Sequence, residues 1–320
     1  MSSVSDAIQS YGDNPSAFLA LNSGNEYFTV PGLAGGIVYR TAGRYLVQFA
    51  GPFAPDDTYA QLLRQFLDFA AGQRRRVVGI QLQRHDAVRY AEHGFTVNQL
   101  GSSYAVDLSK FTLRGSRFMR LRNKIKRAAR SGVVVAEQDL ADSQPALAEI
   151  DREWLRSKGR HAKQLQFLVG EATGGVRRLF MARIEGEPVG YITYSPVYGS
   201  RPGWMHDLSR RRLDVPPGVM EAINSTAIDM FQQEQVPWLH FGFTPFVGLD
   251  PALEVGAASP LVSRIVRLLA EHGNAVYPAA SQLAYKEKWS PHAVLPEYLA
   301  FQGRPRIGAV YRLLRVTNAL

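Results

Sequence analysis

The stretch at 203–230, GWMHDLSRRRLDVPPGVMEAINSTAIDM, constrains the fold of this chain more than any other. Its second part predicts a helix, with Asp214 as the N-cap, the prolines 216–217 in the first turn and Gly218 at the opening. Apolar residues then recur at helical spacing, at Val219, Ile223, Ala227, Met230 and Phe231. Its first part supplies Asp207 and a group of arginines: Arg201, Arg210, Arg211 and Arg212. A strand that brings charges to a helix start makes a site for an anion or an acyl group, because free N–H groups point outward there.

The rest of the chain alternates strands and helices in two successive runs. The first run has strands at 36–40, 45–50, 77–82 and 103–108, with a helix at 55–73. The second run has a helix at 144–155, strands at 178–184, 188–199 and 238–243, a helix at 261–272, two further strands from AYKEKWSP and EYLAF, and a helix at 307–316.

This element order is typical of an acetyltransferase-like fold. The predicted fold class is therefore α/β (α+β), a tandem acetyltransferase-like arrangement of two mixed sheets flanked by helices. The predicted units are an N-terminal domain at 1–113, a basic connecting helix at 114–132 and a C-terminal catalytic domain at 133–320.

The connecting helix carries almost all of the excess charge. The chain has 37 Lys/Arg and 28 Asp/Glu, for a net charge of +9, and eight of the basic residues and no acidic ones lie at 114–130. Exposed helices normally mix both signs, so this run predicts contact with a polyanion, although a solvated surface helix is the alternative. The residues expected to bind it are Arg117, Arg120, Arg122, Lys124, Lys126, Arg127 and Arg130.

Composition excludes several other classes. The absence of cysteine excludes disulfides, thiolate catalysis and Cys-type zinc sites. No apolar run is long enough for a membrane span, and the N-terminus lacks a signal-peptide pattern. No histidine pair has the spacing of a zinc site. We therefore expect a cytoplasmic protein without a metal or cofactor.

Four segments resemble the soluble catalytic domain of bacterial phosphatidylglycerol lysyltransferases. They are LRNKIKRAARSGV at 121–133, the first part of the central stretch at 203–223, FGFTPFVGL at 241–249 and YKEKWSP at 285–291. The resemblance covers roughly residue 35 to the C-terminus. It implies aminoacyl-tRNA as the donor and an ester-forming transfer to a hydroxyl, either of phosphatidylglycerol or, as in soluble members of antibiotic pathways, of a small metabolite.

The same resemblance suggests the site residues. Asp207 and Arg210 match one motif, and Asp207 would bind the ammonium group or orient the acceptor, while Arg210 would pair with Asp207 or contact the terminal adenosine. Lys286 and Lys288, expected to share one face of a strand, would hold phosphate or the developing oxyanion. We assign Asp207, Arg210 and Lys288 to catalysis. A buried ion pair and a solvated strand edge are the structural alternatives.

Other residues are assigned to substrate binding or to the core. Lys286, Arg211, Phe243 and Phe246 are expected to bind substrate, with a plain hydrophobic turn as the alternative for the two phenylalanines. His206 should point to the strand face opposite Asp207, and His240 is expected to be a satisfied core group.

Two further functions compete with aminoacyl transfer. A coenzyme A-dependent N-acyltransferase needs N–H donors for a pyrophosphate at the helix start, but LDVPPGVM has one glycine and two prolines there. A non-catalytic RNA-binding module would keep the basic helix but would not need Asp207, Arg210 or the lysine pair. Among acceptors we favour a soluble one, because no helix is expected to couple a strong apolar face to a basic one, although the basic helix could still make a peripheral contact with anionic lipid.

Overall fold

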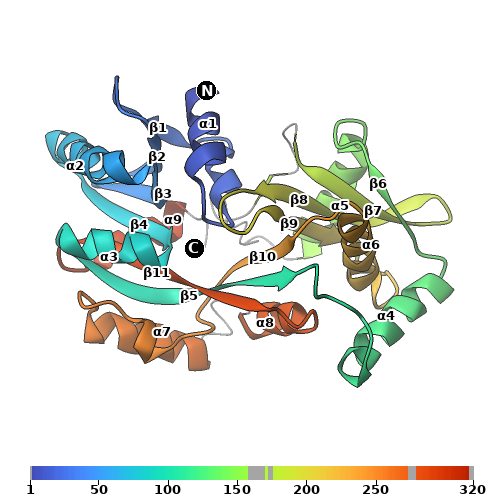
Figure 1. The fold of residues 1–320 in the computed structure, drawn as a ribbon. Helices are drawn as coiled ribbons and strands as arrows, with labels where there is room; N and C mark the ends of the chain where they lie inside the picture. Colours follow the sequence, from blue (N-terminus) through green and yellow to red (C-terminus); the bar gives the residue numbers. More distant parts are fainter. Residues whose placement is uncertain (1, 158–169, 172–175, 273–278, 317–320) are drawn as a thin grey trace.

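The computed structural model describes residues 2–157, 170–171, 176–272 and 279–316, and its centre is one mixed sheet of eleven strands (Figure 1). The strand order is β1-β2-β3-β4-β11-β5-β10-β9-β8-β7-β6. The strands are β1 (Glu26–Phe28), β2 (Gly36–Ala42), β3 (Tyr45–Phe53), β4 (Arg76–Leu82), β5 (Phe95–Asp107), β6 (Val134–Gln138), β7 (Arg178–Ile184), β8 (Glu187–Val197), β9 (Gly203–Arg211), β10 (Trp238–Pro245) and β11 (Ala293–Gln302).

Helices cover both faces of this sheet. The α-helices are α1 (Ser2–Tyr11), α2 (Asp56–Gly72), α3 (Arg84–Glu92), α4 (Met119–Arg130), α5 (Gln144–Ser157), α6 (Val219–Gln233), α7 (Pro260–His272), α8 (Ala279–Glu287) and α9 (Ile307–Val316). Three short 3-10 helices are η1 (Ala17–Leu21), η2 (Ser116–Phe118) and η3 (Pro251–Leu253). In the N-terminal half α2 and α3 pack on one face, and α1, η1 and α9 on the other. In the C-terminal half α4, α6 and α8 share one apolar core, and α5 covers the opposite face.

The two halves meet edge to edge. β5 pairs with β11 on one side and with β10 on the other, and β11 lies between β4 and β5 although it comes last in the chain. The acetyltransferase-like α/β fold predicted from element order is thus confirmed. The two expected sheets are joined into one, because β5 is long enough to belong to both halves. The division at 113/114 and 132/133 stays a prediction, and it falls in the connection from β5 through α4 to β6.

Two details of the predicted elements are wrong. The segment AYKEKWSP is not a strand: its first half belongs to α8, whose apolar Ala279 and Leu283 lie at helical spacing and pack into the core. Asp214 does not cap α6, which begins at Val219 after Gly218 in the left-handed conformation, with φ of 99°. A side chain at Gly218 would come within 2.2 Å of the backbone oxygen of Lys124, so close packing of α4 requires glycine at this helix start.

Candidate functional site

The parallel strands β9 and β10 diverge near the centre of the sheet. They pair only from Gly203 to Met205 and from Trp238 to His240, although both strands continue. β10 is irregular against β5 just beyond this point, and Gly242 there has φ of 66°. An irregularity of this kind leaves backbone groups outside the ladder, where they can bond to side chains or ligands.

Lys286 occupies this divergence. Its side chain is buried, and Nζ donates to the Gly242 carbonyl at 2.7 Å and to Thr244 Oγ1 at 2.5 Å. Burial lowers the pKa of Lys286 from 10.5 to about 7. A neutral amine can make both donations and keep its lone pair. Lys286 is thus a potential base near neutral pH.

A buried carboxyl group lies in the electrostatic field of Lys286. Burial raises the pKa of Glu297 to about 7, while the hydroxyl of Ser103 and the charge of Lys286 oppose this rise. Ser103 donates to Glu297 Oε1, whereas Oε2 has no hydrogen-bond partner among the described residues. Two groups that titrate near neutral pH in one buried region are typical of catalytic sites.

A second cluster connects this region to the basic helix. Glu221, in the first turn of α6, accepts from Lys288 at 3.0 Å and from Lys124 of α4 at 3.3 Å through the same oxygen. Burial favours the neutral form of Glu221, but the hydrogen bond from Lys288 and the two lysine charges outweigh it and lower its pKa. Glu221 thus holds α4 and the end of α8 together. Lys286 and Lys288 do not share a strand face, because the first belongs to α8 and the second follows it.

Asp207 and Arg210 do not pair with each other. Asp207 accepts from Arg177 at 3.0 Å, and both side chains are buried. Burial raises the pKa of Asp207, and the ion pair with Arg177 opposes that rise. Arg210 instead lies 3.8 Å from the ring centroid of Trp154 on α5. The expected Asp207–Arg210 pair is therefore wrong, because Arg177 occupies the place beside Asp207.

His206 and Asp207 point to opposite faces of β9, as expected. His206 packs against Tyr285 of α8 and Phe241 of β10, whereas Asp207 faces Arg177. Burial, with a smaller contribution from the charge of Lys286, lowers the pKa of His206 to about 3. This imidazole is therefore neutral and contributes no charge.

The remaining predicted substrate residues are dispersed. Arg211 is exposed and donates only to neighbouring backbone carbonyls. Phe243 is half-buried against Gly101, and Phe246 donates its N–H to the Leu100 carbonyl. The two phenylalanines thus lie at the end of β10 beside β5, and their part in acceptor binding stays a prediction.

Most of the cations of α4 are exposed. Arg122 is the exception, since it donates to the carbonyls of Leu113 and Gly115 and fixes the entry to the helix. Lys124 is held by Glu221. The other basic residues of α4, namely Arg120, Lys126, Arg127 and Arg130, and Arg114 and Arg117 just before it, have no acidic partner among the described residues. A cationic surface without counter-charges lies next to the buried lysine site.

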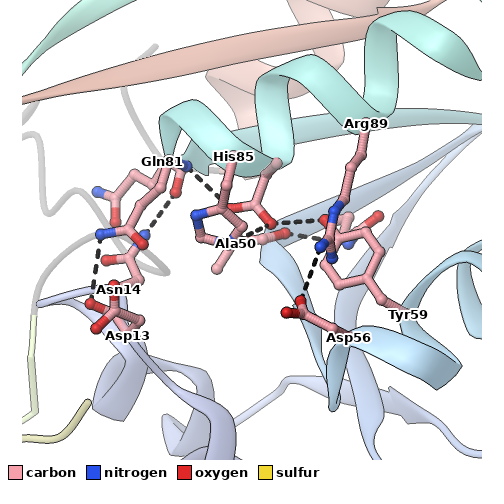
Figure 2. Close-up of polar contacts among 11 residues, drawn as sticks. Asp13, Asn14, Ala50, Asp56, Tyr59, Gln81, His85 and Arg89 are labelled. Atoms are coloured by element: carbon pink, nitrogen blue, oxygen red, sulfur yellow. Dashed lines mark hydrogen bonds and ion pairs between the residues drawn. The ribbon is translucent and has the colours of Figure 1, made fainter. Parts of the chain in front are cut away.

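The N-terminal half has a matching divergence, which is filled by its own side chains. β3 and β4 pair in parallel as far as Phe49 and Ile80, and the residue after each has positive φ. Here the Gln81 carbonyl accepts from the amide of Asn14 at 2.7 Å (Figure 2). In the C-terminal half the Gly242 carbonyl accepts from Lys286 instead. Of the two matching carbonyls, only the one in the C-terminal half is held by an amine.

Some buried polar atoms in each half lack a close hydrogen-bond partner. Among the described residues, these buried atoms are Gln48 Oε1, Gln81 Oε1 and Tyr90 Oη in the N-terminal half, Glu297 Oε2 on β11, and Ser195 Oγ, His206 Nδ1, Asp207 Oδ1, Asn224 Nδ2, His240 Nδ1 and Trp289 Nε1 in the C-terminal half. His240 bonds Arg201 through Nε2, so its prediction as a satisfied group holds for one nitrogen only. Several of these groups nevertheless interact with one another: Tyr90 with Gln48, Asp207 with Ser195, and His206 with Asn224.

Sequence reasoning missed Glu221, Glu297 and Arg177. Glu221 lies inside the central stretch, and its place on the buried face of the predicted helix was the available signal. Nothing near Glu297 or Arg177 in sequence distinguishes them, because their partners are distant along the chain. Within the described residues no cluster of His, Asp and Glu could hold a metal ion. No described helix has both the length and the apolar character that crossing a bilayer requires.

These features define an acetyltransferase-like α/β protein with a buried amine at the divergence of two parallel strands. The family model described as "Phosphatidylglycerol lysyltransferase, C-terminal" matches residues 5–301, and the chain belongs to this family.

Individual relatives agree with this assignment. The phosphatidylglycerol lysyltransferase of Bacillus subtilis is 28% identical over 273 residues, which are 83% of this chain and 31% of that protein. The chain thus spans about a third of that relative. The structure of L-PGS from Bacillus licheniformis matches with a TM-score of 0.76 at 22% identity, covering 98% of this chain and 96% of that chain. The C-terminal domain of a putative lysylphosphatidylglycerol synthetase from Agrobacterium fabrum matches with a TM-score of 0.75 at 21% identity, covering 99% and 95%. These structural likenesses establish the fold.

Proposed function

We propose that this protein is an aminoacyltransferase that moves an amino acid from charged tRNA to a hydroxyl group, with phosphatidylglycerol as the leading acceptor and a small hydroxyl-bearing metabolite as the other. The observation that carries the proposal is the buried Lys286 on the Gly242 carbonyl, at the point where β9 and β10 diverge. Membership of the lysyltransferase family supports the lipid acceptor. A cytoplasmic location, where charged tRNA is available, belongs to the same proposal.

We infer aminoacyl-tRNA as the donor from the positive charge of α4. Aminoacyl-tRNA is a polyanion, and apart from Lys124 the exposed arginines and lysines of α4 have no acidic partners among the described residues. Glu221 links this helix directly to Lys288 at the end of α8. A tRNA bound along α4 would therefore present its acylated end beside the buried amine.

The reaction needs a base, because the acceptor hydroxyl must lose its proton as it attacks. Neutral Lys286 would take this proton through its lone pair while the hydroxyl oxygen bonds to the ester carbonyl carbon. When the tetrahedral intermediate collapses, the bond to the terminal ribose oxygen breaks. That oxygen then takes the proton back, and a new ester is left on the acceptor.

The other predicted catalytic residues have supporting roles in this scheme. Lys288, held by its ion pair with Glu221, would be a cation near the developing oxyanion. Asp207 is buried beside Arg177, Ser195 and the backbone of Gly170, and from this place it would bind the α-ammonium group or orient the acceptor. Arg210 would contact the terminal adenosine from its place on Trp154.

Coenzyme A transfer is disfavoured by the start of α6. The backbone of α4 packs against Gly218, and the preceding prolines supply no N–H groups. A pyrophosphate therefore lacks its usual donors at this helix start. A non-catalytic RNA-binding module gives no reason for a buried lysine with a lowered pKa.

The direct test uses the purified chain with individually radiolabelled aminoacyl-tRNAs at low salt. Selective ester loss from one tRNA, with label appearing in phosphatidylglycerol, would support donor and acceptor together. Loss that does not depend on lipid would keep the donor and direct the search to small hydroxyl compounds. If no charged tRNA is bound or consumed, the proposal fails and acyl thioesters become the leading donors.

A further inference from the structure

We propose that α7 is a docking surface for an anionic lipid bilayer, which brings the chain to its acceptor. Leu261, Ile265 and Leu268 follow one another at helical spacing, and their exposed fractions are 67%, 47% and 50%. Three large apolar side chains therefore form one outward stripe along the helix. Isolated exposed apolar residues are ordinary, but a continuous stripe on a packed helix indicates a partner.

The helix itself is firmly attached to the domain by its inner face. Val266 is buried, and Ser263 accepts from Asn98 of β5 at 2.7 Å and donates to Glu254 at 2.7 Å. The outward stripe is thus held in place by contacts on the opposite side of the same helix. It is a surface feature of a folded element.

Charge identifies the partner as anionic. Arg264 and Arg267 are exposed along one side of the stripe, and the single acidic residue of α7, Glu271, lies in its last turn. Apolar residues on one face with basic residues beside them are characteristic of helices that lie in the interface of an anionic membrane. From sequence we expected no such helix, so the proposal departs from that expectation.

The position of α7 suits delivery of a lipid headgroup. The segment that leaves β10, just after the groups that bind Lys286, runs through η3 into α7. α7 packs beside β5, and both α7 and α8 lie below β5 in Figure 1. α9 also has several exposed large apolar residues, but it packs on β2 and β3 in the N-terminal half. A membrane on α7 would thus lie close to the proposed acceptor entrance, and this consequence depends on the proposed function.

The test measures co-sedimentation of the full chain with vesicles of pure phosphatidylcholine and of equal parts phosphatidylcholine and phosphatidylglycerol. We expect binding to the anionic vesicles only, and a loss of about tenfold or more in affinity for the triple variant Leu261→Ser, Ile265→Ser, Leu268→Ser. Arg264→Gln with Arg267→Gln should also lose about tenfold.

A matched control removes three exposed valines from separate elements: Val88→Ser, Val134→Ser and Val176→Ser. Their exposed fractions of 45%, 68% and 56% are comparable with those of the stripe. Equal binding by the stripe variant and the wild type would overturn the proposal. So would an equal loss in the control, or a wild-type dimer that becomes monomeric in the stripe variant.

Transfer assays separate this inference from the proposed function. If both the docking surface and the proposed function are correct, the stripe variant loses transfer to phosphatidylglycerol in vesicles but keeps transfer to a short-chain, monomeric phosphatidylglycerol. If α7-dependent vesicle binding is present and the wild type transfers to neither form, the docking surface stands and the proposed acceptor falls.

Discussion

At the residue scale, the central feature is the amine of Lys286, whose pKa is lowered by burial to about 7. If Lys286 is the base, kcat/KM should rise about tenfold per pH unit below its pKa and level off above about 7, because only the neutral amine accepts a proton. Lys286→Arg keeps a permanent charge and should lower kcat/KM by about 100-fold or more. Initial rates across a pH series give the profile, and the exposed Lys110→Arg serves as control. An unchanged acidic limb in Lys286→Arg would exclude Lys286 as the base.

The same residues should shape the pH dependence of stability. The pKa of Glu297 is raised in the folded state, so its contribution is lost as pH rises from about 4.5 to about 7. The pKa of Lys286 is lowered, so stability is regained as pH rises from about 7 towards 10.5. The free energy of unfolding should therefore pass through a minimum near neutral pH, with a depth on the order of 1–3 kcal/mol. Urea denaturation across this range measures it, and Lys286→Met with Glu297→Gln should flatten the curve. A maximum near neutral pH in the wild type would contradict the assignment.

At the element scale, α4 is the prediction that sequence supports best. Eight basic residues without an acidic one specified both the helix and its exposed cationic surface. The strand predicted at 285–291 failed because a short helix with lysines at its end has no clear period in sequence. The start of α6 was displaced because the packing of α4 on Gly218, a contact between distant segments, decides where that helix begins.

If α4 binds tRNA, its exposed basic residues should determine how steeply tRNA binding depends on salt concentration. Replacing Arg120, Lys126 and Arg127 with glutamine should weaken tRNA binding and reduce the slope of log K against log salt by about 2–3, if each contacts one phosphate. Filter binding of deacylated tRNA across a salt series measures the slope. The exposed residues Arg64, Arg74 and Arg76 lie on the N-terminal half, and their substitution by glutamine makes the same charge change. Equal effects of the two triple variants would mean that α4 is not the tRNA surface.

At the scale of the whole molecule, two acetyltransferase-like halves form one structure. Element order along the chain could predict the tandem fold and the strand–helix junction at 203–230, since both depend on local pattern. It could not predict the insertion of β11 between β4 and β5, or the ion pair of Arg177 with Asp207, because neither leaves a local trace. The sequence motifs thus predicted residues such as Asp207 and Lys286, whereas only the three-dimensional structure revealed the groups that contact them.

This shared architecture predicts that both halves unfold together. β5 is common to both halves of the sheet, and the core around α1 and α9 also contains Val197 of β8 and Met205 of β9. All four tryptophans lie in the C-terminal half, at Trp154, Trp204, Trp238 and Trp289. Their fluorescence therefore reports on that half alone, whereas far-ultraviolet circular dichroism reports on the whole chain.

A substitution in β11 distinguishes one cooperative unit from two. Leu299→Ala removes a buried side chain from the core of the N-terminal half and should cost about 2–4 kcal/mol. If the halves are coupled through β5 and β11, the fluorescence and dichroism transitions in urea remain superimposed and shift together. Val88→Ala, at an exposed position of α3, should move neither transition by more than about 0.5 kcal/mol. A fluorescence midpoint that stays in place while the dichroism curve splits would show that each half is stable on its own, and would make the continuous sheet an association of two independent domains.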